Sequence, residues 1–517
     1  MAEALNYRCH LMAMIAAVVL TVDTAAQSRS LLSELQRLSQ PVAVESLSDY
    51  EANPAAMFYR DSVSLSSLSA FFDWTDEEKP VMVQLGDGQT MFGLGAESYS
   101  RRKSEEVVWG NASFRSGTYR NIRWADCIDY RRVAPYVLGD EAGGNLSSRR
   151  YAFAGGYARR ISQWTVGIHA AYRAEIAFRN RDPRVKTVVS DLDIDAGATY
   201  RVSDKNILGF NAALNVYNQN CDLEFYNPVN EINTYTLTGL GTYYRRFMGN
   251  TNKSSGYKSF GYKFGLQWLP LERKDGLGIT ASFNSYRMEQ QLRNFNNLTL
   301  GFSDNDILAV RVAYKFYISD GVIFRPFADG GFHHRKSTEN LFGTSAGASY
   351  DKIGSRQPYK SEDSYVGLSL PLQLGCGKSS TFFTVTPSVV GEWQNESYTE
   401  PLRKIEVSRI TPEITFDFST VASQIWLWHI ALGGGYAKNL SADGVFTELD
   451  TTSSLGETVM SNYSMLCADR RTVNASASLS RPVDKNVVMA VKLGYSMTDY
   501  VGEGVRHSVG VTVSAQF

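Results

Sequence analysis

The chain has 517 residues, of which 43% are hydrophobic, 20% charged and 12% aromatic, and its formal net charge is −1. This composition is too apolar for a disordered chain, and a mean hydropathy of −0.24 is too polar for a bundle of membrane helices. The balanced charge also gives no reason to expect nucleic acid as the main partner.

Residues 1–26 have the form of a signal peptide. Arg8 precedes an apolar run at residues 11–22, and small residues follow up to Ala26. A run of roughly a dozen apolar residues suits a signal peptide, whereas a membrane anchor needs about 20. Cys9 lies before the run rather than after it, which argues against a lipid anchor. The sequence therefore predicts export, with cleavage near Ala26.

Residues 27–61 precede the first predicted strand. Leu31, Leu35 and Leu38 lie on one face of a short predicted helix, and an Asn-Pro-Ala triplet follows at 53–55. If the following strands close into a barrel, we expect this segment in the periplasm or folded into the lumen. It is too short to be the folded plug that a 22-strand TonB-dependent receptor carries.

From residue 62 to the carboxy-terminus, apolar residues alternate with small or polar ones over stretches of roughly ten residues. The pattern is clearest at the end of the chain, where Val509, Val511 and Val513 alternate with Gly, Thr and Ser, and Phe517 is the last residue. Such alternation predicts strands with one apolar and one polar face. The 29 Tyr, 26 Phe and 42 Gly against 14 Pro fit strands joined by glycine-containing turns.

The predicted strands are joined by short turns and long connections in alternation. The short turns lie at residues 101–104, 159–163, 202–205, 269–275, 319–321, 375–380, 419–423 and 482–485, and the long connections at 116–147, 174–189, 218–256, 288–305, 335–361, 395–403 and 438–468. With first strands at 62–74 and 81–99, this order predicts 18 strands, within a range of 14–20. Residues 235–246 look strand-like inside one long connection. We interpret them as an extracellular hairpin, and the count would be 20 if they spanned the membrane.

We interpret residues 62–517 as one all-β domain, a transmembrane antiparallel outer-membrane β-barrel. A soluble antiparallel sheet has the same period, but a soluble chain of this length would divide into several domains, and no shift of composition marks a boundary. Within a bilayer, only a closed barrel satisfies the backbone polar groups of strands. Short periplasmic turns, long extracellular loops and an even strand number place both termini in the periplasm of a Gram-negative bacterium.

If the apolar face of each strand meets lipid, the opposite residues line the lumen. The predicted lumenal acids are Asp191, Asp193, Asp195, Asp329, Glu392, Glu413 and Asp417, and the predicted lumenal bases are Arg201, Lys263, Arg311, Lys315, Arg325, Arg409 and Lys492. Equal numbers of acids and bases predict weak ion selectivity or an interior filled with ion pairs. Across the turn at 319–321, Arg311 should lie near Asp329 and Lys315 near Arg325. Such a mixed cluster could orient an anion, but it is more typical of a structural role.

The sequence carries no enzyme signature, and we expect no catalytic residue, metal or cofactor. His169 and His429 are predicted to face inward, but neither belongs to a nucleophile motif. The Asp-x-Asp-x-Asp pattern at 191–195 resembles the start of a calcium loop, yet Gly197 comes one place late and Val202 stands where a glutamate is needed.

Four cysteines remain after removal of the signal peptide: Cys127, Cys221, Cys376 and Cys467. An exported protein enters a compartment that permits disulfides, and the spacing of these cysteines is not that of a metal site. Cys376 falls in a short turn away from the other three, so we expect at most one bridge. The sequence leaves its two members open.

Five short motifs are distributed along the chain. They are Asn53-Pro54-Ala55, Phe-Gly-Leu-Gly-Ala-Glu-Ser-Tyr at 92–99, Arg-Asn-Ile-Arg-Trp at 120–124, Gly155-Gly156-Tyr157 and Leu-Thr-Gly-Leu-Gly at 237–241. Together they resemble an uncharacterised family of Bacteroidetes outer-membrane β-barrel proteins, along nearly the whole chain. The resemblance implies an exported barrel associated with TonB-dependent nutrient-uptake systems, and it carries over no catalytic or ligand residue. The first motif also resembles a triplet near the start of fatty-acid-transporter-type barrels.

We therefore expect a non-enzymatic outer-membrane barrel that takes part in small-molecule or nutrient uptake, as a porin-like channel or as the companion of a TonB-dependent transporter. The alternatives are a closed surface-binding or structural barrel that presents extracellular loops to a partner, and a fatty-acid-transporter-like carrier of hydrophobic molecules. The expected partners are outer-membrane lipid, the barrel assembly machinery, for which Phe517 is the expected signal, and a TonB-dependent receptor or surface lipoprotein. An open lumen would favour a channel, and a filled one would favour the surface-binding barrel.

Overall fold

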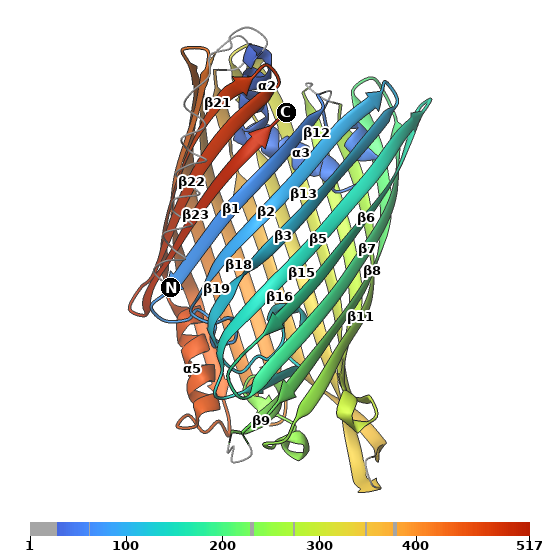
Figure 1. The fold of residues 1–517 in the computed structure, drawn as a ribbon, viewed down its shortest axis with the longest axis vertical. Helices are drawn as coiled ribbons and strands as arrows, with labels where there is room; N and C mark the ends of the chain where they lie inside the picture. Colours follow the sequence, from blue (N-terminus) through green and yellow to red (C-terminus); the bar gives the residue numbers. More distant parts are fainter. Residues whose placement is uncertain (1–27, 62, 228–231, 272–274, 347–348, 376–379) are drawn as a thin grey trace.

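The computed structural model describes residues 28–61, 63–227, 232–271, 275–346, 349–375 and 380–517. The predicted signal peptide, residues 1–26, and Cys376 lie outside the described residues. The described strands form one closed antiparallel barrel with 18 strands in its wall (Figure 1). The barrel closes because the first strand pairs with both the second and the last strand. The predicted fold class and strand number are confirmed.

Each wall strand pairs with its neighbours in chain order. The strands are β1 (Leu65–Glu77), β2 (Gly88–Lys103), β3 (Glu106–Ile122), β5 (Gly144–Ile161), β6 (Trp164–Phe178), β7 (Arg184–Arg201), β8 (Asn206–Glu224), β11 (Lys253–Pro270), β12 (Gly276–Leu292), β13 (Leu298–Ser319), β14 (Val322–Phe324) with β15 (Phe327–Ala346), β16 (Ser349–Ser369) with β17 (Leu372–Leu374), β18 (Thr381–Tyr398), β19 (Arg403–Ala422), β20 (Trp426–Phe446), β21 (Arg470–Asp484), β22 (Val487–Tyr500) and β23 (Gly504–Gln516). The short strands β14 and β17 pair with each other and extend the wall strands β15 and β16. The wall therefore has no free edge, which satisfies the backbone polar groups of every strand.

Short turns lie at one end of the barrel, here called the turn end, and the longer connections lie at the opposite loop end (Figure 1). Several loop-end connections are shorter than the sequence predicts. The predicted connection at 288–305 is mostly strand, because β12 continues to Leu292 and β13 begins at Leu298. The outer face of this stretch is polar, as the exposed ion pair of Arg287 with Asp304 at 2.6 Å illustrates. Apolar alternation therefore cannot reveal it as strand.

The strand-like residues 235–246 do not join the wall. β9 (Thr234–Gly239) pairs with β4 (Val137–Asp140) and β10 (Thr242–Tyr243) in a separate three-stranded sheet at the loop end. Our interpretation of these residues as a hairpin that does not span is confirmed, so the wall keeps 18 strands.

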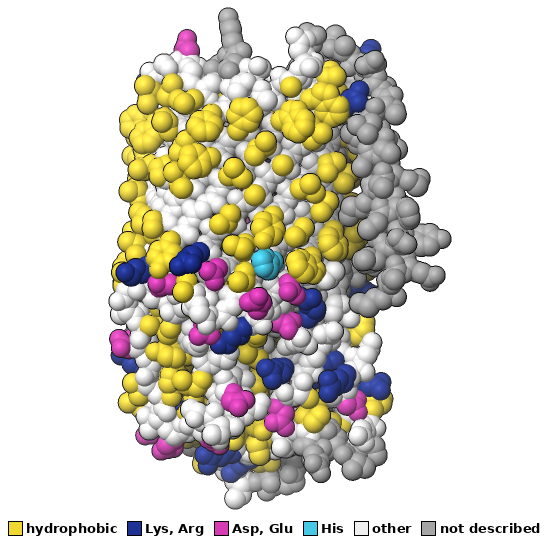
Figure 2. All heavy atoms as spheres, turned by 90° about the vertical axis from the view of Figure 1, so that its left-hand side faces the viewer, with side chains coloured by type: hydrophobic (Ala, Val, Ile, Leu, Met, Phe, Trp, Pro, Cys, Tyr) yellow, Lys and Arg dark blue, Asp and Glu magenta, His cyan; other side chains and the backbone are white. Residues whose placement is uncertain are grey.

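The outer surface of the barrel carries a broad apolar band. Figure 2 shows apolar side chains over the part of the wall nearer the turn end, and charged side chains over the part nearer the loop end. Ile168 on β6, Leu266 on β11 and Leu432 on β20 are each more than half exposed, so the band extends over distant parts of the wall. Soluble proteins rarely expose apolar surface of this extent, whereas outer-membrane barrels present such a band to lipid.

The helices of the described residues are short. They are α2 (Ser28–Leu38), α3 (Pro41–Glu51), α4 (Tyr130–Val133), α5 (Ser454–Cys467), η1 (Ala56–Tyr59), η2 (Val83–Leu85), η3 (Arg245–Phe247) and η4 (Arg293–Phe295). In the described parts of the chain, no helix has the length and apolarity needed to cross a membrane. The helices α2 and α3 lie at the turn end, and α5 lies at the loop end (Figure 1).

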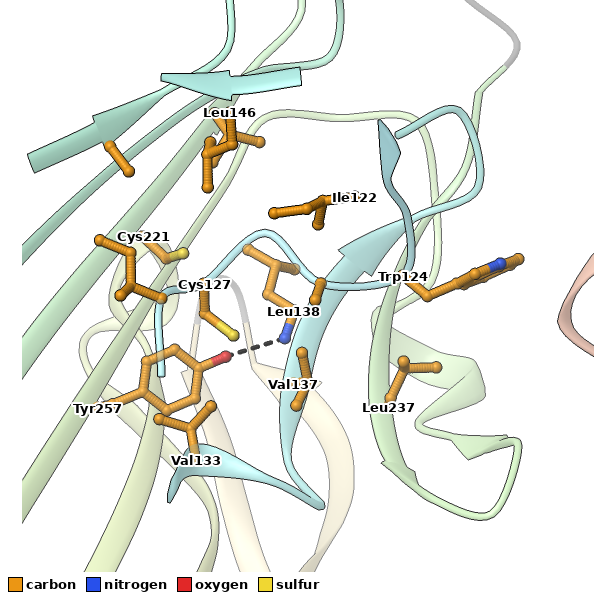
Figure 3. Packing of buried hydrophobic residues seen from close by; sticks show 14 of the residues in the cluster. Ile122, Trp124, Cys127, Val133, Val137, Leu138, Leu146, Cys221, Leu237 and Tyr257 are labelled. Carbon is orange, nitrogen blue, oxygen red and sulfur yellow. Dashed lines mark hydrogen bonds between the residues drawn. The ribbon is translucent and has the colours of Figure 1, made fainter. Parts of the chain in front are cut away.

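The largest buried apolar cluster lies at the loop end and joins the wall to residues 123–143, which we call the loop cap (Figure 3). The cap contributes Trp124 and Leu138, and the wall strands contribute Tyr217 and Tyr257; each of these four side chains is at most 1% exposed. Burial of one large apolar side chain contributes roughly 1.5–3 kcal/mol. The cluster therefore holds the cap firmly against the inner wall.

The cysteines Cys127, Cys221 and Cys467 are free thiols. The first two belong to the apolar cluster of the loop cap (Figure 3), and Cys467 ends α5. Among the described cysteines, the bridge that the sequence leaves open is therefore not formed.

Candidate functional site

Residues 28–61, which we call the N-terminal segment, lie against the inner wall at the turn end (Figure 1). Leu32 and Leu35 of α2 are buried against Leu427 and Val488 of the wall, and Leu31 packs beside them. The helix α2 contacts β19, β21 and β22, whereas η1 contacts β3, β5, β6 and β7. Because these strands lie far apart around the wall, the segment crosses the lumen.

The Asn-Pro-Ala triplet packs tightly against the wall. Asn53 is fully buried; its Oδ1 accepts a hydrogen bond from the Ala55 amide at 2.9 Å, and its Nδ2 donates to the Phe210 carbonyl at 3.2 Å. A Cβ at Gly167 would lie 2.5 Å from the Ala55 nitrogen, and a Cβ at Gly197 would lie 2.0 Å from Asn53 Oδ1. The wall therefore needs glycine at both positions to receive the triplet.

Two ion pairs attach α3 to the wall. Arg325 donates to Asp49 at 2.6 Å, and Arg311 donates to Glu45 at 3.0 Å. The Arg325 and Asp49 side chains are only 3% and 9% exposed. Removal of one partner of a buried pair leaves an uncompensated charge, which costs about 3–5 kcal/mol. The position of α3 therefore depends on these carboxylates.

At the other end, charged side chains fix the loop cap to the wall. Arg132 of α4 donates to Asp191 at 3.2 Å and to Asn215 at 2.5 Å, and Arg173 donates to Asp129. Burial opposes ionisation of Asp129, but the hydrogen bond and charge of Arg173 outweigh it and lower the pKa of this carboxyl. An arginine of the cap thus binds a carboxylate of the wall, and an arginine of the wall binds a carboxylate of the cap.

A second set of bonds lies in the buried interior of the cap. Arg179 is 5% exposed and pairs with Asp126 at 3.4 Å and with Asp140. Tyr257 accepts a hydrogen bond from the Leu138 amide at 2.9 Å (Figure 3), and Arg335 donates to the Ala134 carbonyl at 2.8 Å. The cap at the loop end thus has a hydrogen-bonded interior.

Between the N-terminal segment and the loop cap the lumen contains polar cavities, which we call the chamber. One cavity of about 260 Å³ is lined by Arg132, Asp193, Asn215, Lys263, Asn284 and Tyr286, among others. A second of about 200 Å³ is lined by Asn211, Lys263, Arg311, Asp329 and Tyr365, among others. The two cavities share Lys263 and therefore adjoin. Their walls offer ammonium, guanidinium, carboxylate and amide groups, which suit a small polar solute.

The three aspartates of β7 lie on the chamber side of the wall. Asp191 binds the loop cap through Arg132. Asp193 accepts a hydrogen bond from Asn215 at 3.1 Å, and Asp195 accepts one from Asn211 at 3.0 Å. Amides and arginines contact these carboxylates, and the described residues contain no group of three or more His, Cys, Asp or Glu side chains that could hold a metal ion.

The predicted cluster across the turn at 319–321 is brought together. Arg311 stands directly opposite Asp329 in the register of β13 and β15, but it forms its ion pair with Glu45 of the N-terminal segment. Lys315 and Arg325 line the same small cavity beside α3. These basic side chains therefore meet the segment, which the sequence analysis did not anticipate.

The remaining predicted lumenal residues lie away from the chamber, on β18, β19 and β22 and, for Arg201, at the turn end of β7. Glu392 lies 3.6 Å from Arg409, and Asp417 lies 3.4 Å from His429. Glu413 lies beside Gly435, Lys492 is exposed, and Arg201 pairs with Asp204 at the turn end. Phe517, the expected assembly signal, exchanges backbone hydrogen bonds with Ser66. These residues do not belong to the chamber.

Sequence reasoning missed the residues that close the lumen: Glu45 and Asp49 in the N-terminal segment, and Asp129 and Arg132 in the loop cap. Each lies outside the alternating strands, so periodicity assigns it no face. The leucine face of Leu31, Leu35 and Leu38 and the Asn-Pro-Ala triplet were the sequence signals that pointed to the segment.

The chain is similar to one protein family and to several barrels of known structure. Among solved structures, the copper transporter OprC has 9% identity over 84% of this chain and 64% of its own length, with a TM-score of 0.41. The ferric preacinetobactin receptor BauA from Acinetobacter baumannii has 8% identity over 88% and 80%, with a TM-score of 0.38. The siderophore receptor PirA from Pseudomonas aeruginosa has 8% identity over 88% and 81%, with a TM-score of 0.37.

This chain thus spans less than two thirds of the length of the copper transporter. A search of curated proteins found no match. A family model described as "Family of unknown function (DUF6850)" matches residues 54–517.

Proposed function

We propose that this chain, which belongs to the family of unknown function DUF6850, is a non-enzymatic outer-membrane barrel that passes a small polar molecule through its lumen when the N-terminal segment moves. In this proposal, residues 1–26 direct export, the turn end with both termini faces the periplasm, and the loop end faces outward. The apolar band meets lipid, and Phe517 is the signal for the barrel assembly machinery.

The observation that carries the proposal is the polar chamber between two closures made by the chain itself. At this level the inner wall carries small residues such as Ala213, Gly261 and Ala309. A barrel that served only as a rigid support would gain packing from larger side chains at these positions. Small residues around a polar space instead suit a solute that enters and leaves.

We assign the gate to α3 rather than to the loop cap. Within α3 the buried residues are Val42, Asp49 and Tyr50, and its ion pairs with Arg311 and Arg325 attach it to the wall. The cap, by contrast, is buried in the largest apolar cluster of the described residues. Displacement of α3 therefore costs less than displacement of the cap.

The gate is tested by ion conductance and solute-dependent liposome swelling. The double variant Glu45→Gln, Asp49→Asn should conduct several-fold more than the wild type, because the wall arginines lose their charged partners. Glu51→Gln is the matched control, since Glu51 pairs with Arg60 inside the segment itself. If correctly folded wild-type and variant barrels are equally silent, the gate assignment is wrong.

A second candidate is a closed barrel that presents its loop end to a TonB-dependent receptor or surface lipoprotein. The buried ion pairs of Arg179 with Asp126 and Asp140 favour it, because they stabilise a fixed cap. Silence in the conductance experiment would favour this candidate.

A further inference from the structure

Four connections converge at the loop end around a pocket of about 430 Å³. They contain η3, the hairpin of β15 and β16, the connection from β18 to β19, and the residues that follow β20. This volume lies within the range of roughly 300–1,000 Å³ that is common for small-molecule sites. The pocket shares no lining residue with the two chamber cavities, so it is a separate site.

The carboxylates of the pocket are largely occupied by one arginine. Arg356 donates to Glu339 at 3.0 Å and lies 3.9 Å from Glu400. Glu339 also accepts a hydrogen bond from the Tyr398 hydroxyl at 2.7 Å. Among the lining residues, Glu448 is the remaining carboxylate.

None of the other three arginines of the pocket forms an ion pair with a carboxylate among the described residues. Arg403 donates to the carbonyls of Leu240 at 2.7 Å and Glu448 at 3.1 Å, and Arg246 donates to the Phe342 carbonyl at 2.8 Å. Arg245 is exposed, and no ion pair is formed by it within the described chain. Three guanidinium groups thus face a single spare carboxylate, which gives the pocket an excess of positive charge.

The pocket also has flat apolar surfaces and one unfilled acceptor. Tyr243, Tyr244 and Phe342 supply aromatic rings to its lining. Asn340 is 4% exposed; its Nδ2 donates to the Thr299 carbonyl at 2.8 Å, but its Oδ1 has no hydrogen-bond partner among the described residues. A buried acceptor without a partner is unfavourable, so a donor from a ligand would complete it.

We propose that this pocket binds an organic anion that carries a flat ring and a hydroxyl or amide donor. Guanidinium groups bind carboxylates through charge-assisted hydrogen bonds, and aromatic side chains stack on flat rings. The pocket lies at the end of the barrel opposite the gate, where a solute would first be captured. That role in uptake rests on the proposed function, whereas binding itself does not.

Calorimetric titration of the full-length protein in detergent tests the site, with 6-hydroxy-2-naphthoate as the probe and uncharged 2,6-dihydroxynaphthalene as its matched analogue. The anion should bind about tenfold more tightly than the uncharged analogue. Arg245→Ala should weaken binding of the anion about fivefold to tenfold. Arg181→Ala, a matched exposed arginine of another loop-end connection, should leave it unchanged.

Two results would overturn the proposal: equal binding of the charged and uncharged probes, or equal affinity of the two arginine variants. A second variant, Asn340→Leu, should weaken binding of 6-hydroxy-2-naphthoate more than that of 2-naphthoate, which lacks the hydroxyl. Heat-modifiable migration on gels establishes that each variant is folded. Since binding is measured without transport, failure here leaves the conductance test of the gate unaffected.

Discussion

Val491 and Lys492 are neighbours in β22 whose side chains face opposite sides of the wall. Val491 stands opposite Leu479 and Val513 in the adjacent strands, whereas Lys492 stands opposite Ser478 and Thr512. Successive residues of a strand alternate between faces, so Val491 belongs to the apolar outer face and Lys492 to the lumen.

A charge at these two positions should have different effects on stability. Val491→Arg should lower the free energy of unfolding by about 2–4 kcal/mol, because the side chain lies on the apolar outer face that meets lipid, whereas Lys492→Arg should change it by less than about 0.5 kcal/mol. Urea unfolding in lipid vesicles measures both. Equal tolerance at the two positions would contradict this register.

Lys253 gives the loop end a pH dependence. It is 6% exposed at the start of β11, where its ammonium donates to the carbonyls of Thr234 at 2.9 Å and Phe247. Burial lowers its pKa from 10.5 to about 8. Between these two values the unfolded chain binds more protons than the folded chain, so the stability contributed by this residue rises with pH.

The contribution of Lys253 should therefore be smallest below about pH 8 and should grow as the pH approaches 10.5. Unfolding of the wild type and of Lys253→Met at pH 7.5 and pH 10 measures it as a difference, in which other titrating groups cancel. The wild type should gain stability relative to the variant at the higher pH. A relative loss would refute the direction of this pKa shift.

At the scale of elements, closure depends on β23. It pairs with β22 and with β1, so its two edges complete the ring of hydrogen bonds. Deletion of residues 505–517 would leave two strands with unpaired backbone groups in the apolar band, which is prohibitive in lipid.

The truncated chain should therefore fail to form a heat-modifiable, membrane-embedded species. Phe517→Ser is the control, because it keeps the strand pairing and removes only the terminal ring. Its barrel should close, but more slowly if the assembly machinery recognises the ring. Membrane extraction and gel mobility measure both variants. Normal assembly of the truncated chain would be incompatible with this account of closure.

At the scale of the whole molecule, charges of the lumen compensate one another. Arg132 pairs with Asp191, Arg311 with Glu45, and Glu392 lies near Arg409. Opposite charges on one wall cancel beyond a Debye length of roughly 8 Å at physiological salt.

Glu45→Gln and Asp49→Asn open the gate but remove the acids that pair with Arg311 and Arg325, so the permeability ratio of cations to anions in this variant should lie below unity. Addition of Arg311→Gln and Lys315→Gln should shift the ratio toward cations, because the remaining wall is more acidic. Reversal potentials in a salt gradient measure the ratio. An unchanged ratio would show that these two residues do not face the conducting path.

Much of the wall could be predicted from the sequence because lipid and water impose opposite requirements on alternate residues of every spanning strand. The run that includes Val509, Val511 and Val513 shows this directly. At the strand ends near Arg287 both faces of the strand are polar, so apolar and polar residues no longer alternate there. The sequence therefore predicts the number of strands better than their length.

The closures of the lumen were decided only by the tertiary structure. Glu45 meets Arg311 and Arg132 meets Asp191 across long separations in the chain, from segments that carry no periodic pattern. A charged residue in such a segment has many possible partners in the sequence, and only the folded structure shows which one it pairs with. By itself, the sequence determined the barrel and which residues face lipid or the lumen, since these follow from local alternation. The polar chamber follows from contacts that exist only once the barrel has formed.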